Sequence, residues 1–449
     1  MANISTSASR QGNPPAPAHA LHPLAAELDR TLSADGCVVA SLLAETGRRV
    51  YFPYGGILGQ GTEAKSCEIN ATIGMAFEED GSPLTLECFE KSVNLPKRAF
   101  LYCGSFGSPE LRAAWRQMQI RKNPGLAGKT FSNPVVTNAL THGLKIAASL
   151  FVEPGDTLIV PEQRWDNYDL IFREMHDAQI AAYPMFSPSR GFNAAGLAAR
   201  LAEPGDKKIV LLNFPNNPTG YTATDEDAAA IVAALKNAAD SGKKIVAVLD
   251  DAYFGLVYEK GIHGESLFTE LCDASPNIIA VKLDGTTKED YVWGMRVGFV
   301  TFGWKGASAS QLRAMEAKSA GIVRATISNV SSLGQNMAVR AYADPEFEAQ
   351  KREKYETLRA RYHEIRRILS EHGEYLGAFE AMPFNSGYFM CVKPKGVDAE
   401  AVRRRLVEKY STGVIAISGL IRLAFSTIPL AKLETLFANV YSAINDLRA

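Results

Sequence analysis

The stretch KKIVLLNFPNNPTGYT, residues 207–222, joins an aliphatic run to a rigid turn. The run is apolar at nearly every position, which is typical of a strand that is covered on both faces of a parallel sheet. The prolines, asparagines and glycine that follow are common turn formers, so the turn alone is a weak indication of function. It does place an amide, Asn217, just beyond the end of a strand, where open parallel sheets bind their ligands.

Similar aliphatic runs alternate with longer amphipathic segments from about residue 130 to 305. The amphipathic segments have the pattern of helices, which would return the chain for the next parallel strand. We therefore predict a three-layer α/β lobe with a mostly parallel sheet. The expected strands are NPVVTNA (133–139), DTLIVP (156–161), QIAAYPM (179–185), KKIVLLNF (207–214), KKIVAVLD (243–250), NIIAVKLD (277–284) and RVGFVTFG (296–303).

The character of the chain changes after about residue 335. A charged segment, residues 344–373, carries apolar residues at helical spacing, which predicts one long helix with a single buried stripe. Short strands, YFMCVKP (388–394) and LIRLAFS (420–426), alternate with further helices, which indicates a smaller α+β lobe. The expected stripe is formed by Leu358, Tyr362, Ile365, Ile368 and Leu369.

Composition excludes several classes of protein. Lys and Arg number 48 against 49 Asp and Glu, so no broad positive field favours nucleic acid or an anionic membrane. The N-terminal residues lack the apolar core of a secretory signal, and no run of about 18 apolar residues predicts a membrane span. The dispersed cysteines show no zinc spacing, so we expect reduced thiols, no metal site and a cytoplasmic protein. These cysteines are Cys37, Cys67, Cys88, Cys103, Cys272 and Cys391.

Two later strands are followed by ionisable residues. KKIVAVLDDAYFGLVYE (243–259) ends its apolar run in Asp250 and Asp251, whose side chains should point to opposite sides. A carboxylate beside an apolar strand end is costly unless a cation meets it, and a helix cap is the plainer alternative. After the next strand Lys288 stands as the candidate cation, with Lys282 competing for that role.

The elements Asn217-Pro218-Thr219-Gly220, Asp250-x-x-Tyr253, Lys288 and Arg296-x-Gly298 occur in this order. Together they resemble the signature of the class I/II aminotransferases, which are fold type I pyridoxal 5'-phosphate enzymes. The resemblance runs from about residue 50 to the C-terminus and includes the aspartate and aromatic aminotransferase branch. It implies a large α/β lobe and a smaller lobe, in agreement with the hydrophobic pattern.

The resemblance implies a role for each of these residues. Lys288 would form the Schiff base with the cofactor aldehyde and later move the substrate α-proton, which requires a pKa lowered from about 10 towards neutrality. Asp250 would keep the pyridine nitrogen protonated. Asn217 and Tyr253 would donate hydrogen bonds to the phenolic oxygen of the cofactor, and Asp251 would be structural.

A phosphate site is implied in VVTNALTHGLKIAASLF, residues 135–151, where a strand leads into a helix. The first amides of a helix bind anions, so Ala139 and Leu140 would contribute their backbones and Thr141 its hydroxyl. Arg296 would pair with the phosphate.

Two further positions complete the implied cofactor site. Trp165 would stack on the cofactor ring, although a tryptophan is otherwise usually part of the core. The chain has Gly285 where many relatives carry a serine that contacts the phosphate, and Thr287 can still offer a hydroxyl.

Substrate recognition is implied at Arg422, which lies among apolar residues in GVIAISGLIRLAFSTIP (413–429). It would grip the substrate α-carboxylate through two hydrogen bonds, with an internal carboxylate as the alternative partner. INATIGMAFEEDGSPLTL (69–86) resembles the substrate-covering segment, with Gly74 at the close approach.

Two further residues are given roles by the resemblance. Tyr102, in FLYCGSFGSPELRAA (100–114), would cross to the phosphate of the neighbouring subunit, which implies an obligate homodimer with shared active sites. In GIVRATISNVSSLGQ (321–335), Arg324 stands where aspartate aminotransferases bind the distal carboxylate. A surface arginine is the alternative there.

We therefore predict a pyridoxal phosphate-dependent aminotransferase of amino acid metabolism. It would move an amino group between an L-amino acid, with aspartate, glutamate or aromatic ones favoured, and a 2-oxo acid by a ping-pong mechanism. A carbon–sulfur β-lyase on the same fold is the alternative enzyme. The ligand-sensing domain of a transcription regulator is a third reading, disfavoured because no basic winged-helix module precedes this fold.

The predicted domain limits follow from the pattern and the resemblance. A chain of 449 residues exceeds what one core usually organises. We expect a flexible tail over 1–22, and the N-terminal part of the small domain with the substrate-covering segment over 23–90. The large cofactor-binding domain should span 91–334 and the C-terminal small domain 335–449.

Overall fold

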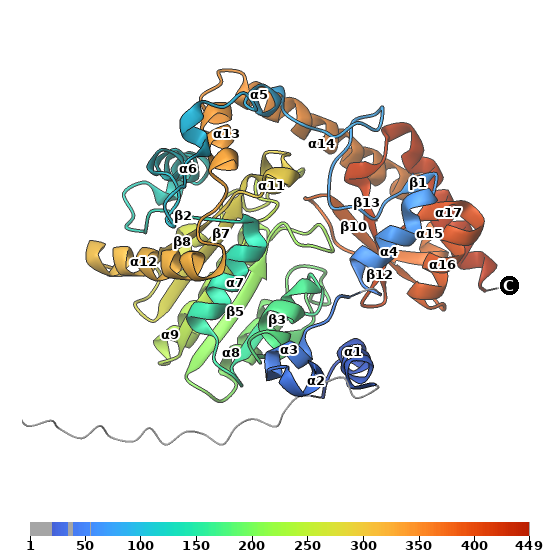
Figure 1. Cartoon of the computed structure of the whole chain (residues 1–449). Coiled ribbons are helices and arrows are strands. Elements are labelled where there is room, and N and C mark those ends of the chain that lie inside the picture. Colours follow the sequence, from blue (N-terminus) through green and yellow to red (C-terminus); the bar gives the residue numbers. More distant parts are fainter. Residues whose placement is uncertain (1–19, 35–38, 54, 449) are drawn as a thin grey trace, which may run out of the picture.

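The computed structural model describes residues 20–34, 39–53 and 55–448. The larger lobe is built on one seven-stranded sheet with the strand order β2-β8-β7-β6-β5-β3-β4 (Figure 1). All seven aliphatic runs expected to form strands belong to it. They are β2 (Val135–Thr137), β3 (Thr157–Pro161), β4 (Gln179–Tyr183), β5 (Lys207–Asn213), β6 (Lys244–Asp250), β7 (Ile278–Gly285) and β8 (Gly298–Gly303).

The sheet is parallel except for β8, which runs antiparallel to both of its neighbours. Residues alternate between its faces, since Ile209 and Leu211 belong to one buried cluster and Val210 and Leu212 to the other. The prediction of a three-layer α/β lobe is therefore confirmed. One face packs against α7 (Ala139–Phe151) and α12 (Ala309–Thr326), and the other against α8 (Ala194–Ala202), α9 (Asp225–Asp240) and α10 (Phe268–Leu271).

The smaller lobe contains a four-stranded antiparallel sheet, with the order β12-β13-β10-β9. Its strands are β9 (Phe379–Ala381), β10 (Phe389–Pro394), β12 (Ile415–Ile417) and β13 (Leu420–Ala424), and a short parallel pair joins β1 (Ile69–Asn70) to β11 (Thr412–Gly413). Helices α15 (Tyr375–Ala378), α16 (Ala399–Tyr410) and α17 (Leu433–Asp446) complete it.

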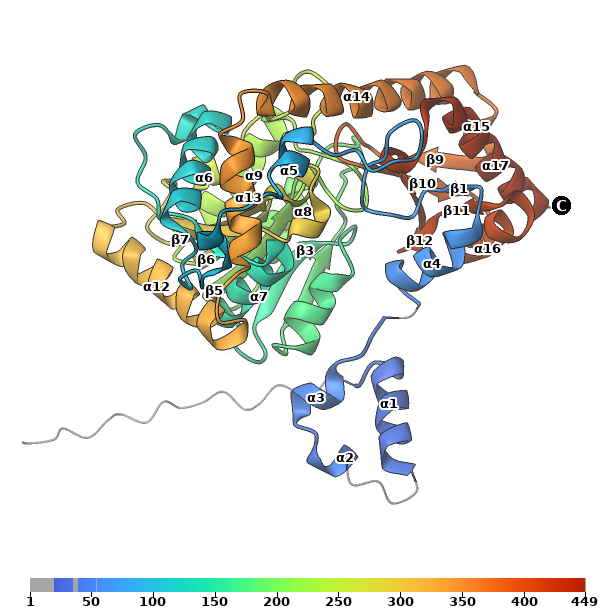
Figure 2. The same ribbon diagram turned by 45° about the horizontal axis from the view of Figure 1, so that its top comes forward.

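A long helix, α14 (Phe347–Glu371), runs along both lobes (Figure 2). The predicted apolar stripe lies on its inner side, where Leu358, Tyr362, Ile365 and Ile368 are buried and Leu369 is half-buried. Three more helices pack together on the larger lobe, near the first residues of α14. They are α5 (Glu87–Lys91), α6 (Pro109–Lys122) and α13 (Ser332–Tyr342).

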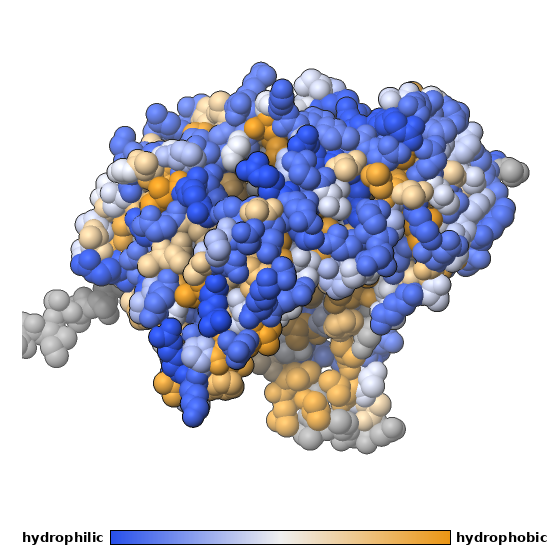
Figure 3. Space-filling model, turned by 90° about the horizontal axis from the view of Figure 1, so that it is seen from above, coloured by the Kyte–Doolittle hydropathy of each residue, from blue (hydrophilic) through white to orange (hydrophobic). Residues whose placement is uncertain are grey.

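The N-terminal helices stand apart from both sheets (Figure 2). They are α1 (Pro23–Ser33), α2 (Val39–Leu42) and α3 (Glu45–Arg49). Arg49 pairs with Asp177 of the larger lobe at 2.5 Å. Apolar residues gather over this segment at the lower edge of Figure 3, and they include the exposed Leu28, Leu42 and Phe52.

The chain joins the smaller lobe at α4 (Ile57–Glu63). Gln60 of this helix donates to the carbonyl of Ala416 at 3.0 Å and accepts from its amide at 2.8 Å. The limits predicted for the four segments stay a prediction, and residues 1–19 of the expected tail lie outside the described residues.

Five cysteines of the described part are unpaired, and Cys37 lies outside it. Within that part, no helix is both long and apolar enough to cross a bilayer.

The turn of the opening stretch forms the junction of the two lobes. The carbonyl of Gly220 accepts from the amides of Asn385 and Ser386, each at 2.9 Å, and Asn385 also bonds both backbone groups of Thr222. Gly220 has a φ of 72°, and a Cβ there would lie 1.9 Å from the carbonyl oxygen of Phe389. A rigid, side-chain-free turn is therefore needed where the lobes meet.

We predict that Gly220→Ala destabilises the protein far more than Gly261→Ala. Gly261 has a φ of 76° with nothing within 4 Å of an added Cβ, so alanine there costs only about 1–2 kcal/mol of conformational strain. At Gly220 the collision should add roughly 1–3 kcal/mol or more. Thermal unfolding followed by circular dichroism measures both, and equal shifts in Tm would contradict a tight junction.

Candidate active site

Most of the predicted site residues line one cavity at the carboxyl ends of β3, β5, β6 and β7. The register aligns Asn213 of β5 with Asp250 of β6, and Asp250 with Leu283 of β7, so these strands end together. The predicted residues in the cavity are Ala139, Leu140, Thr141, Trp165, Asn217, Asp250, Tyr253, Thr287, Lys288 and Arg296. Tyr168, Asn213 and Ala252 also line it.

Asp250 is the buried acid of this cavity, with 2% of its surface exposed. Tyr168 donates its hydroxyl to Oδ2 at 2.7 Å, and the amide of Ala252 donates to Oδ1 at 3.2 Å. Burial raises the pKa of Asp250, while the Tyr168 hydrogen bond and the charge of Lys288 oppose that shift. Asp250 therefore has a fixed orientation towards a cationic or N–H group in the cavity.

Lys288 lies on α11 (Thr286–Glu289), a single turn directly after β7. Burial and the positive charge of Arg296 lower its pKa to about 8, and the negative charge of Asp250 opposes this shift. Its Nζ lies 5.1 Å from the centre of the Tyr253 ring, and its carbonyl accepts from the hydroxyl of Tyr388 at 3.0 Å. Near neutral pH such an amine has a far larger neutral, nucleophilic fraction than an ordinary lysine.

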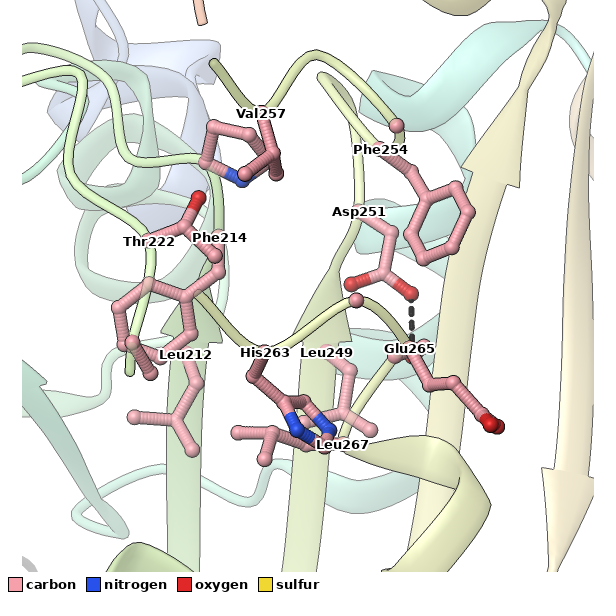
Figure 4. A pocket seen from close by; sticks show the side chains of 15 residues that line it. Leu212, Phe214, Thr222, Leu249, Asp251, Phe254, Val257, His263, Glu265 and Leu267 are labelled. Carbon is pink, nitrogen blue, oxygen red and sulfur yellow. Dashed lines mark hydrogen bonds between the residues drawn. The ribbon is translucent and has the colours of Figure 1, made fainter. Parts of the chain in front are cut away.

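Asp251 points to the other side of the sheet, as the sequence predicted. It is ion-paired with Lys282, accepts from the Ser266 hydroxyl at 2.6 Å and reaches a cavity of about 30 Å³ beside His263 (Figure 4). Lys282 is buried there, also 3.5 Å from Asp284. Lys282 is therefore committed to a structural ion pair, and Lys288 alone of these two lysines faces the candidate site.

The amide of Asn217 connects the cavity to the smaller lobe. Its backbone N–H donates to the side chain of Asn213 at 2.8 Å, which fixes the turn. Its Oδ1 accepts from Nη1 of Arg422 at 3.1 Å, so its nitrogen is the atom left to donate into the cavity. This answers why an amide stands at the end of the opening strand.

Arg422 of β13 is 1% exposed and has no ion pair with any carboxylate of the described residues. Its Nη2 donates to the carbonyl of Thr72 at 2.7 Å, its Nε has no hydrogen-bond partner, and the guanidinium lies 4.3 Å above the Phe389 ring. The alternative of an internal carboxylate partner is thus excluded for the described part of the chain. A buried cation in this state is suited to an incoming carboxylate.

Gly74 lies at the same junction, because a Cβ there would be 3.6 Å from the Phe389 ring and 3.9 Å from the Tyr253 hydroxyl. Tyr102 and Arg324 lie outside the cavity. Tyr102 is 95% exposed, and Arg324 is an exposed residue that donates to the Ser328 hydroxyl at 2.7 Å. The predicted roles of Tyr102 at a neighbouring subunit's phosphate and of Arg324 at a distal carboxylate stay predictions.

A narrow cradle lies at the start of α7. A Cβ on Gly298 would come within 2.9 Å of the Ala139 Cα, and one on Gly285 within 2.7 Å of the Gly298 Cα. A serine at position 285 therefore cannot fit this backbone, which explains the departure noted in the sequence. The hydroxyl of Thr287 is buried without a hydrogen-bond partner among the described residues.

Sequence reasoning missed Tyr168 and Asn213, which hold Asp250 through its carboxylate and its carbonyl. Asn213 ends the opening strand, so its place beside Asp250 could have been inferred from the parallel register. Tyr168, three residues after Trp165, carries no such signal.

The fold and this site define a class of enzyme, and comparison with known proteins identifies it. The model of the aminotransferase class I and II family matches residues 84–440, so the chain belongs to that family. The predicted family is thereby confirmed, and pyridoxal 5'-phosphate is the cofactor of its members.

Individual relatives are distant. The chain is 28% identical over 204 residues to a probable N-acetyl-LL-diaminopimelate aminotransferase of Bacillus subtilis, covering 44% of this chain and 47% of that protein. It is 26% identical over 372 residues to an aspartate aminotransferase of Thermotoga maritima, covering 80% and 87%. The first match therefore spans about half of its relative, as does that to an aspartate aminotransferase of Musicola paradisiaca.

Solved structures show the fold. The aspartate aminotransferase of Saccharomyces cerevisiae cytoplasm superposes with a TM-score of 0.72 at 20% identity, covering 88% of this chain and 98% of that one. A Pyrococcus horikoshii kynurenine aminotransferase gives 0.74 at 16% identity, covering 93% and 100%. The predicted fold type I architecture is confirmed.

The residues present fit the cofactor. The orphaned Thr287 hydroxyl, the first amides of α7 and Arg296 form an anion site, which suits the phosphate. Asp250 can hold the pyridine nitrogen, the Asn217 nitrogen can donate to the phenolic oxygen, and Lys288 can carry the covalent bond.

We predict that Lys288 of the apoprotein reacts with an amine-selective reagent with a midpoint near pH 8. Only the neutral amine reacts, so modification should rise as the pH rises through that value, whereas ordinary lysines need about pH 10.4. Arg296→Gln removes a positive charge and should move the midpoint up, and Asp250→Asn should move it down. Peptide mass spectrometry measures the extent of modification. A midpoint above pH 10 in the unaltered chain would exclude the arrangement described here.

Proposed function

We propose that this protein is a pyridoxal phosphate-dependent aminotransferase that moves an amino group from an L-amino acid to a 2-oxo acid. The observation that carries the proposal is that Asn217 connects the cavity of Lys288 and Asp250 to the buried Arg422. On one side Lys288 and Asp250 face the cavity, and on the other the buried Arg422 pairs with no carboxylate of the described residues. This arrangement can hold a substrate carboxylate while an amine acts on the carbon next to it.

When bound, pyridoxal 5'-phosphate would supply an aldehyde carbon that takes up the amino group and a ring that accepts electrons. The protein's own part begins with Arg422, which can bind the α-carboxylate through two of its N–H groups. Asn217 accepts a hydrogen bond from Arg422 and also lines the cavity, so it fixes the position of the bound carboxylate relative to Lys288. Because Gly74 has no side chain, the segment 69–86 to which it belongs can lie close to the substrate.

Lys288 can then accept the α-proton and return it at a different atom. Its pKa of about 8 suits both steps, since a base works best when its pKa lies near the working pH. Asp250, oriented by Tyr168, stabilises positive charge beneath the reacting centre. Tyr253 and Trp165 exclude water from the cavity walls.

The same residues could serve a carbon–sulfur β-lyase, because both reactions begin with loss of the α-proton. Aminotransferases predominate among the relatives named above, which favours transfer. Aspartate, glutamate and aromatic amino acids are the donors that the sequence favours.

We also propose a cytoplasmic homodimer that shares its active sites. Exposed apolar residues lie close to Tyr102 along the chain, and a subunit placed against them would remove their surface from water. They are Phe100, Leu101 and Phe106. Sedimentation of the purified protein tests this, and a monomer at micromolar concentration would refute it.

One experiment separates the two reactions. Incubated with a donor amino acid alone, the loaded enzyme should release one 2-oxo acid per subunit and stop, then resume when a second 2-oxo acid is added. Continuous release of pyruvate and ammonia would instead establish the lyase. Lys288→Ala should abolish release in both cases, whereas Lys236→Ala, on the exposed side of α9, should leave it unchanged.

Substitution of Arg422 should weaken substrate use through binding. Arg422→Lys keeps the charge but loses the two-pronged contact, so we expect kcat/KM to fall about 100-fold, equivalent to ~3 kcal/mol. The fall should lie mainly in KM. Arg313→Lys, at an exposed position of α12, is the matched control. An unchanged KM in Arg422→Lys would remove this residue from the substrate site.

A further inference from the structure

A second cavity, of about 550 Å³, opens beside the cofactor site and shares Thr141 and Trp165 with it. We call it the side chamber. Its remaining walls come from residues 22–24, 51–53 and 55–58 of the N-terminal segment and from residues 165–173 after β3. Its volume lies in the range of cavities that hold small organic molecules.

The chamber wall is largely apolar and aromatic. Tyr51 is held in place by His22, whose ring stacks on it at 4.0 Å, and Trp165 packs edge-on against Tyr168 at 5.6 Å. A bulky apolar group that enters this space leaves water and gains contact with the wall, which is favourable in proportion to its area. The apolar lining includes Leu24, Tyr51, Ile57, Leu58, Trp165 and Leu170.

Most charges at the chamber are already neutralised. Asp169 accepts two hydrogen bonds from Arg164, at 3.0 and 3.1 Å, and also pairs with Arg173 at 3.2 Å. Arg173 has a second partner in Glu174 at 2.8 Å. These two arginines and two carboxylates balance one another, so neither sign of charge is left over from them.

Asp166 is the exception, because this half-buried carboxylate has no ion pair within the described part of the chain. The backbone amide of Ile57 faces it, and a Cβ on Gly56 would lie 3.0 Å from its Oδ2. Burial raises its pKa, and Arg422 lies near enough to lower it. Asp166 therefore lies in the chamber wall, near the arginine that binds the α-carboxylate but in no ion pair with it.

We propose that the side chamber receives the substrate side chain and selects L-amino acids with bulky, uncharged side chains, aromatic ones above all. Asp166 rejects a second carboxylate, as in aspartate and glutamate, because like charges brought together in a half-buried site repel strongly. It can accept a hydrogen bond from a phenol or an indole N–H. Leu24 of α1 and Tyr51, which follows α3, thus form part of the specificity pocket. This inference rests on the proposed aminotransferase function.

Selectivity can be measured on the loaded full-length enzyme with four donors: phenylalanine, tyrosine, aspartate and glutamate. We expect kcat/KM for the aromatic pair to exceed that for the dicarboxylic pair at least about tenfold. Asp166→Asn keeps the shape and the acceptor for the Ile57 amide but removes the charge. It should raise kcat/KM for aspartate and glutamate about tenfold and change that for phenylalanine little.

Binding of two unreactive analogues gives a second measurement. Calorimetry should show that 3-phenylpropanoate binds the unaltered enzyme more tightly than succinate, and that Asp166→Asn tightens succinate binding about tenfold. Asp206→Asn, an equal loss of charge in an exposed loop before β5, should change neither value. Equal Tm values confirm that each variant is folded.

A preference for aspartate or glutamate in the unaltered enzyme would overturn the proposal, most directly if Arg324→Ala removed that preference. Unchanged succinate binding in Asp166→Asn would overturn the role of Asp166. Absence of transfer from every amino acid would instead refute the proposed function, and the two binding constants would still decide the selectivity of the chamber.

Discussion

A carboxylate buried at the end of β6 constrains much of the larger lobe. Asp250 can remain charged there only if its surroundings donate hydrogen bonds and supply positive charge. The structure provides the Tyr168 hydroxyl, the Ala252 amide and Lys288 in the same cavity. The parallel register that brings β5, β6 and β7 to one edge is what makes this arrangement possible.

The two lobes meet through polar groups that are likewise buried. Arg422 comes from the smaller lobe and Asn217 from the larger, and the hydrogen bond between them closes the junction. Gly220 lets the turn approach the backbone of β10 closely enough for this contact. Substrate binding and lobe packing therefore use the same few residues, so a change at the junction affects both.

The strands of the larger lobe and many residues of the candidate site could be predicted from the sequence, each for its own physical reason. Strands buried on both faces leave continuous apolar runs, and all seven were recognised. The alternation of side chains along a strand separated Asp250 from Asp251 correctly. By contrast, Tyr168 lies 82 residues from its partner Asp250, and no local pattern records such a contact. The resemblance selected Lys288 over Lys282, and the structure adds that Lys282 is held in an ion pair with Asp251 on the other face of the sheet.

The sequence by itself determined the order of the strands along the chain, the turn at Asn217 and the set of residues able to carry the chemistry, since these depend on short-range periodicity and residue type. Only the tertiary structure decided that Arg422 has no carboxylate partner among the described residues, and that a Cβ at Gly285 would collide with Gly298. It also decided that residues 22–24, 51–53 and 55–58 wall a chamber beside Trp165. These features arise from distances between segments far apart in the chain, which packing sets and local pattern does not encode.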